Sequence, residues 1–175
     1  MIKGVIIQGS SRSKGDTNKI VLKLQDLTGF DVIDLKEKHI GHYDYEFKNS
    51  EDDFINLFKN IVTEYRIIIF VTPIYWYAMS GLMKVFFDRI SDFLKLEKDY
   101  GRRLRGMQMA SVSSSNDKRF YDGFDMPFKN SAAYLGMDYL GHLHTWVEDE
   151  KVPFNVVLEL ENFVKGNIFQ KEVKE

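Results

Sequence analysis

The sequence contains no cysteine and only three prolines. The absence of cysteine excludes disulfides, thiolate metal sites, iron–sulfur clusters and a cysteine nucleophile. No apolar run approaches the ~20 residues that a membrane-spanning helix needs. The opening residues, 1–4, lead into an apolar run without a secretory pattern. We therefore expect a cytoplasmic protein with no membrane partner.

Strong charge of either sign is also lacking, since the formal net charge is -2. Proteins that bind nucleic acids usually carry a basic face. Small electron carriers often use a strongly acidic field to steer toward their partners. The charge balance counts against both classes. A chain of 175 residues fits a single domain, which we expect to span residues 1–175.

Apolar runs that predict strands alternate with helical patterns along the chain. The predicted strands are 2–8, 31–35, 66–72, 106–113 and 138–147. The predicted helices are 17–27, 51–63, 80–96, 124–135 and a last one opened by Pro153, while 36–50 looks irregular. This alternation predicts an α/β fold, a doubly wound five-stranded parallel sheet in the order 2-1-3-4-5 with helices on both faces. Ligands of such sheets bind outside the carboxyl ends of the strands, between the first and third strands.

The loop after the first predicted strand, residues 9–18, is rich in groups that bind phosphate. Ser10 and Thr17 offer hydroxyls, Arg12 a guanidinium and Asn18 an amide, and the following helix begins with free backbone N–H groups. Its glycine spacing matches neither a P-loop nor the dinucleotide fingerprint. Asp16 adds a negative charge, and we expect it to cap the helix with that charge turned away. The alternative is an ordinary Ser/Gly-rich turn that caps a helix.

The loop after the third predicted strand contains Pro73, Ile74, Tyr75, Trp76 and Tyr77. The proline fixes the direction of the chain, and the three rings offer flat surfaces on which a planar ring system stacks. The alternative is that the rings make core or dimer contacts. A phosphate-binding loop that faces a cluster of aromatic rings suggests a flat aromatic ligand with a phosphate tail.

A third polar loop, Ser113, Ser114, Ser115 and Asn116, leaves the fourth predicted strand at the same rim. Its backbone N–H groups are suited to the polar edge of a ring ligand. The alternative is a solvated turn.

These motifs resemble those of the flavodoxin-like NAD(P)H-dependent FMN reductase family. Residues 9–18 are similar to the family's Gly-Ser-x-Arg-x-x-Gly-Asn-Thr segment, with Asp16 in place of the asparagine. Residues 72–89 resemble its Thr-Pro-x-Tyr-Trp…Met-Ser-Gly…Lys…Phe…Asp-Arg pattern almost throughout, and 124–141 is similar as well. The third loop lacks the glycines that are common in the family. Relatives that carry an iron–sulfur cluster are excluded by the lack of cysteine.

The resemblance implies bound FMN, with Ser10, Arg12, Thr17 and Asn18 at its phosphate and Asp16 beside them. Residues 73–77 would line the isoalloxazine, with Trp76 and Tyr77 shaping the substrate face, and Ser113–Ser115 would border its other polar edge. NADPH or NADH would donate electrons to the flavin, and a quinone, flavin, azo or nitro compound would accept them. The flavin performs the redox chemistry, so we name no general acid or base.

The predicted helix 80–96 has a broader apolar face than one sheet contact needs, and Ser80 stands where its N-cap should be. Relatives use such helices as subunit interfaces, which implies a homodimer or homotetramer.

Three other features carry weaker predictions. His142 and His144 share one face of a strand, but no third ligand completes a metal site, so we expect none. Residues 102–105 hold three arginines that either meet the extra phosphate of NADPH or form a solvated connector, and we favour the connector. Two rival functions remain, a flavodoxin-like electron carrier that serves a protein partner and an interaction protein that has lost the flavin.

Overall fold

A computed structural model describes residues 2–169 of the chain. Five parallel strands lie in the order β2-β1-β3-β5-β6, which confirms the predicted doubly wound sheet. A further short strand, β4, pairs antiparallel with the end of β3, where we expected an irregular loop. The strands are β1 (Gly4–Gln8), β2 (Asp31–Asp34), β3 (Ile67–Tyr75), β4 (Ala78–Met79), β5 (Gln108–Ser115) and β6 (Asp138–Trp146).

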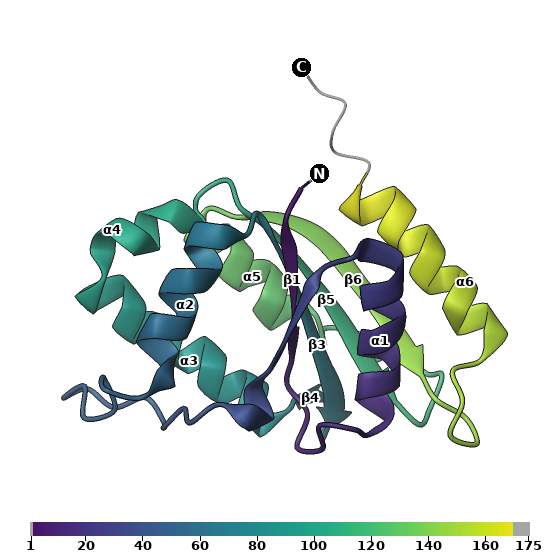
Figure 1. The fold of residues 1–175 in the computed structure, drawn as a ribbon. Helices are drawn as coiled ribbons and strands as arrows, with labels where there is room; N and C mark the ends of the chain where they lie inside the picture. Colours follow the sequence, from purple (N-terminus) through teal and green to yellow (C-terminus); the bar gives the residue numbers. More distant parts are fainter. Residues whose placement is uncertain (1, 170–175) are drawn as a thin grey trace.

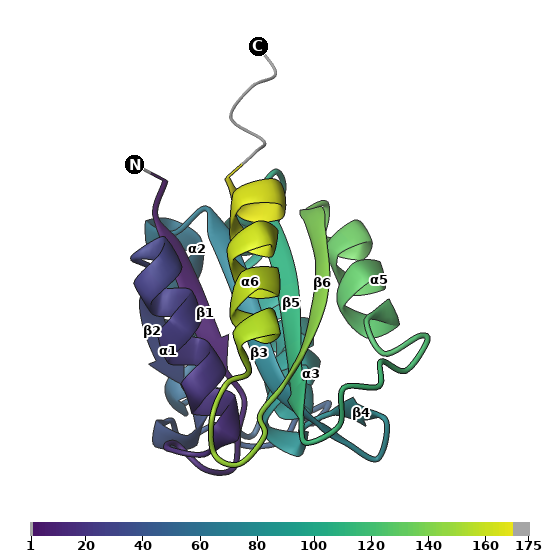
Figure 2. The same cartoon turned by 90° about the vertical axis from the view of Figure 1, so that its right-hand side faces the viewer.

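Helices cover both faces of the sheet (Figures 1 and 2). One face carries α1 (Asp16–Thr28) and α6 (Phe154–Phe163), which continues into a π-helical turn over Val164–Ile168. The other face carries α2 (Asp53–Glu64), α3 (Gly81–Leu96) and α5 (Met126–Leu135). The predicted basic connector, 102–105, contains a 3₁₀ turn over Arg102–Leu104 and follows a short helix, α4 (Lys98–Gly101). A second 3₁₀ turn, Leu35–Glu37, follows β2.

Alternating side chains of the central strands build two separate cores. Ile6 of β1 and Ile69 of β3 pack with α1 and α6, whereas Ile7 and Phe70 pack with α2, α3 and α5. Both strands are apolar along nearly their whole length because a parallel sheet covered on both faces has no solvent side. No helix among residues 2–169 is long and apolar enough to cross a membrane.

Arg89 of α3 is fully buried and ties the 41–52 segment to the helical layer. Its guanidinium donates to Asp52 at 2.5 Å and to Asp92 at 2.6 Å, and also to the backbone oxygens of Gly41 and Asn49. Burial alone would raise the pKa of Asp52, but the bonds from Arg89 and backbone N–H groups outweigh it and hold that pKa below its ordinary value. The guanidinium of Arg89 thereby holds the 41–52 segment against α3.

A bulge in β6 places three polar rings on one face of the sheet. The register of β6 against β5 shifts between Met109 and Ala110, where Gly141 has a φ of 114°. The extra residue turns Tyr139 to the same face as His142 and His144. There the three side chains hydrogen-bond to the serine hydroxyls of β5, Ser111 and Ser113.

Burial sets the charge state of His142. The pKa of His142 is lowered from 6.5 to about 4, mainly because the ring loses its hydration; the Asp125 carboxylate opposes this shift and neighbouring His144 adds to it. Rings of Phe120 and Phe124 cover the imidazole at centroid distances of 5.4 Å. His142 is therefore neutral at pH 7.

Acidification should destabilise the fold through His142. Between about pH 6.5 and about pH 4 the unfolded chain binds a proton that the folded His142 does not, so stability falls as pH falls, by at most about 1.4 kcal/mol per pH unit. Chemical unfolding of wild type and His142→Gln at several pH values measures this slope. The variant should lose part of the slope, and His39→Gln, at an exposed histidine, is the matched control. Equal slopes in wild type and His142→Gln would contradict the assignment.

Candidate functional site

Loops from the carboxyl ends of β1, β3 and β5 enclose a cavity of about 380 Å³. This is the edge where the doubly wound order predicts a ligand, at the lower end of the sheet in Figure 1. Its lining includes nine of the residues selected from the sequence, and also Gly15 and Asn116. The nine are Ser10, Arg12, Asp16, Thr17, Pro73, Ile74, Tyr75, Ser114 and Ser115.

One buried side chain, Ser80, joins the first two loops. As predicted, it is the N-cap of α3, and its hydroxyl accepts from the N–H of Met83 at 3.1 Å. The same hydroxyl donates to the carbonyl of Gly9 at 2.5 Å, and the Ser80 N–H donates to Thr72. The start of the first loop is thus bonded to the end of the second.

Glycine at position 9 is required because α3 packs closely against the start of the first loop. A Cβ there would lie 2.8 Å from the Met83 side chain, so any larger residue would push α3 away from β1. The Gly9 N–H also donates to Val71 of β3 at 2.8 Å, which holds the loop at the switch point.

Asn18 supports the first loop from behind and does not line the cavity. Its amide donates to the side chain of Gln8 at 3.0 Å, and Gln8 in turn donates to the carbonyl of Ser13 at 3.2 Å. Gln8 is fully buried at the end of β1. Sequence reasoning missed Gln8, although a polar residue closing an otherwise apolar strand was the available signal.

Asp16 is the first residue of α1 and makes no capping bond; Gly15 occupies the N-cap position. The expected cap is therefore wrong. Instead, the Asp16 carboxylate pairs with Lys19 one turn along at 2.8 Å. Arg12 is exposed and forms no ion pair with any residue in 2–169. The loop thus presents one free guanidinium, two buried hydroxyls and the start of a helix, a donor set that favours an anion.

The aromatic loop is a tight hairpin between β3 and β4. Tyr75 pairs with Ala78, and the two turn residues, Trp76 and Tyr77, have φ of 49° and 63°. Such a turn usually takes Asn or Gly, because a left-handed conformation costs other residues about 1–2 kcal/mol each. Trp76 is 93% exposed at the tip. Strain concentrated at exposed aromatic residues is typical of functional sites.

Trp76 and Tyr77 line a neighbouring hollow of about 260 Å³ rather than the cavity itself. The hollow shares Ile74, Ser115 and Asn116 with the cavity, so the two spaces adjoin. Tyr121 forms its far wall and meets Tyr77 edge to face at 4.9 Å between ring centroids. Tyr121 could not be selected from the sequence, because its loop has no strong pattern.

The third loop is shorter than expected, because Ser113–Ser115 still belong to β5. Ser114 and Ser115 line the cavity, whereas Ser113 is fully buried and bonds to both histidines of β6. Alternation along a strand explains why Ser114 turns away from the face that Ser113 occupies. In the described part of the chain, no group of three or more His, Cys, Asp or Glu side chains is arranged to hold a metal.

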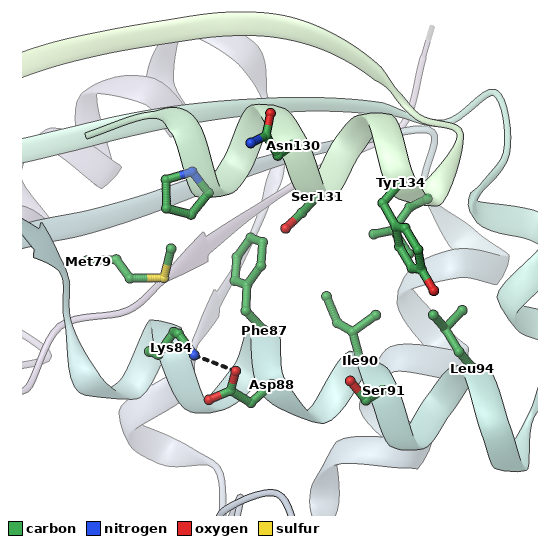
Figure 3. A pocket seen from close by; sticks show the side chains of 12 residues that line it. Met79, Lys84, Phe87, Asp88, Ile90, Ser91, Leu94, Asn130, Ser131 and Tyr134 are labelled. Carbon is green, nitrogen blue, oxygen red and sulfur yellow. Dashed lines mark hydrogen bonds and ion pairs between the residues drawn. The ribbon is translucent and has the colours of Figure 1, made fainter. Parts of the chain in front are cut away.

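A further hollow, of about 410 Å³, lies elsewhere, between α3 and α5 (Figure 3). Phe87, Ile90 and Leu94 of α3 point toward Ser131 and Tyr134 of α5 across an open, largely apolar groove. It shares no lining residue with the cavity, and its Lys84 is paired with Asp88.

The arginines of 102–105 lie at the opposite edge from the cavity, because they immediately precede the amino end of β5. Arg102 pairs with Asp99, and Arg103 donates to Thr63. This position contradicts a role at a dinucleotide bound to the three loops.

Comparison with known proteins identifies the family. The sequence profile described as NADPH-dependent FMN reductase matches residues 2–150. The chain is 29% identical over 154 residues to YwqN of Bacillus subtilis, which carries the name of an NAD(P)H-dependent FMN-containing oxidoreductase; the match covers 81% of this chain and 83% of YwqN.

Solved structures agree with the fold. The Trp repressor binding protein of Bacillus subtilis superposes with a TM-score of 0.75 at 22% identity, covering 94% of this chain and 99% of its own. General stress protein 14 of Treponema denticola, solved in complex with FMN, has a TM-score of 0.56 at 16% identity, covering 96% of each chain. Together with the profile match, the three loops and their position on the sheet lead to one conclusion: the chain belongs to the NADPH-dependent FMN reductase family.

Proposed function

We propose that the protein binds FMN in the cavity between the three loops and uses it to pass electrons from NADPH or NADH to a small acceptor. The acceptor classes are quinones, free flavins, and azo or nitro compounds. The observation that carries the proposal is the meeting of an anion-binding loop and an aromatic hairpin at one cavity. We further propose that residues 1–175 act as one FMN-binding domain in the cytoplasm.

The residues around the cavity fit the two ends of FMN. Ser10, shortly after β1, and Thr17, in the first turn of α1, are each 4% exposed, and their hydroxyls with the backbone N–H groups at the helix start suit a phosphate dianion. Arg12 adds a cation that no carboxylate in residues 2–169 neutralises. The paired Lys19 offsets the negative charge of Asp16, which reduces its repulsion of a phosphate.

The other walls suit a ring system. Pro73, Ile74 and Tyr75 supply an apolar edge, and Ser114 and Ser115 supply polar groups opposite. Asn18 acts indirectly, because it bonds to Gln8, which holds the first loop at Ser13. Ser113 also acts indirectly, through its bonds to His142 and His144. Trp76 and Tyr77 border the adjoining hollow, where we propose that the acceptor or the nicotinamide enters.

Bound flavin supplies the hydride and electron transfer, and the protein binds it, orients it and sets its potential. Accordingly, no side chain is proposed as a general acid or base. The mild net charge of -2 argues against the rival role of an electron carrier steered to a protein partner.

The functional test is anaerobic mixing of the FMN-loaded protein with NADPH and, separately, with NADH. We expect the visible absorption of oxidised flavin to disappear with at least one of them, and to return when a quinone is added. Free FMN at the same concentration is the control for direct reaction in solution. A bound flavin that only a reductase protein can reduce would contradict the enzyme and support the carrier. A chain that takes up no FMN would favour the interaction protein.

We also propose that the protein forms a homodimer, alone or within a homotetramer, through the groove between α3 and α5. The groove is open and largely apolar, and Tyr134 at its rim is 83% exposed (Figure 3). A monomer rarely leaves such a surface uncovered. A second copy fits because the groove lies away from the cavity and leaves it accessible.

Tyr134→Asp should dissociate the proposed dimer, because a carboxylate at a buried interface loses its hydration without gaining a partner. Sedimentation velocity of wild type and variant at micromolar concentration measures the change. Phe154→Asp, at a ring 77% exposed on α6 across the sheet, is the matched control and should remain dimeric. A monomeric wild type, or equal behaviour of the two variants, would contradict this interface.

A further inference from the structure

A chain of hydrogen bonds runs along β5 and β6 toward the candidate flavin site. Tyr139 Oη lies 2.9 Å from Ser111 Oγ, which lies 2.9 Å from His142 Nδ1. His142 Nε2 lies 3.1 Å from Ser113 Oγ, which lies 2.8 Å from His144 Nδ1. His144 Nε2 ends the chain 2.9 Å from the backbone oxygen of Asp117. The chain therefore links the bulge of β6 to the turn after β5.

With both imidazole rings neutral, the last acceptor fixes the direction of every bond in the chain. A backbone oxygen only accepts, so His144 Nε2 donates to Asp117 O, and Nδ1 then accepts from Ser113. Ser113 then accepts from His142 Nε2, and His142 accepts from Ser111 at Nδ1. Ser111 in turn accepts from Tyr139. Each hydroxyl has one hydrogen, so with both rings neutral a single arrangement satisfies all five contacts.

His144 contacts the turn that borders the cavity. Asp117 O accepts both from His144 and from Ser115 Oγ at 2.6 Å, and the Asp117 N–H donates back to Ser115 at 3.0 Å. Ser115 and Asn116 of this turn line both the cavity and the adjoining aromatic hollow. His144 is 8% exposed, and its ring stacks on Trp146, so it has little freedom to move. The 115–117 turn is thus held in place by the bond from His144 Nε2 to the carbonyl of Asp117.

We propose that His144 is a positioning residue for bound flavin, holding the 115–117 turn in the shape that sets the flavin's potential, with the chain through Ser113, His142, Ser111 and Tyr139 bonded to the other nitrogen of its ring. The inference rests on the proposed function, because it requires FMN in the cavity. Polar groups at the edge of a flavin favour the reduced, more negative form. Loosening the turn should therefore weaken binding of reduced FMN more than binding of oxidised FMN.

The test compares midpoint potentials of the FMN-loaded protein. His144→Phe keeps a ring against Trp146 but removes the donor to Asp117, and we expect reduced FMN to lose about tenfold in relative affinity, a fall of about 30 mV for a two-electron couple. His144→Gln retains an N–H donor and should recover most of the potential. Tyr139→Phe removes the first bond of the chain and the interaction of Tyr139 with Asp125, keeps the His144 donor, and should stay near wild type.

The possible outcomes separate this inference from the proposed function. A His144→Phe protein that binds FMN at the wild-type potential overturns the positioning role alone. If that variant does not fold, His144→Leu, which also removes the donor to Asp117, replaces it, and an unchanged potential there has the same meaning. A wild-type protein that takes up no FMN overturns the proposed function, and this inference with it.

Discussion

The candidate site depends on the buried hydroxyl of Ser80. This hydroxyl caps α3 and donates to the carbonyl of Gly9. The backbone N–H of Ser80 donates to the hydroxyl of Thr72. A buried donor or acceptor left without its partner costs about 1–3 kcal/mol, so these bonds are strongly favoured together. They hold the anion-binding loop and the aromatic hairpin at a fixed separation. Neither loop can move relative to the other without breaking one of these bonds.

The sheet and the location of the site could be predicted from the sequence because they depend on patterns along the chain. Ile67–Val71 is a continuous buried run, which identifies a central strand, and alternation with helices gives the order. Ser80 was recognisable as a cap because serine before an apolar helix has few other uses. Ser10, Arg12 and Thr17 followed from the chemistry of phosphate binding at a helix start.

Other parts of the site could not be predicted, because they depend on contacts between distant residues. Ser113 and Ser114 look alike in sequence, but strand alternation sends one to the cavity and the other to the histidines. The role of Tyr139 requires the bulge at Gly141, because the extra residue there turns Tyr139 to the face of the sheet that carries His142 and His144. Asp16 pairs with Lys19 instead of capping α1, a choice between two local partners that propensity does not decide.

The central claim is that the loop at Ser10–Thr17 and the hairpin at Tyr75 hold the two ends of one ligand. The most direct measurement is a titration of the flavin-free protein with FMN and with riboflavin, which lacks the phosphate. We predict one FMN per chain, bound at least about tenfold more tightly than riboflavin, since even one charge-assisted hydrogen bond contributes about 1.5 kcal/mol. In Arg12→Ala that preference should shrink. Equal affinity for the two flavins, or no binding of either, would contradict the account.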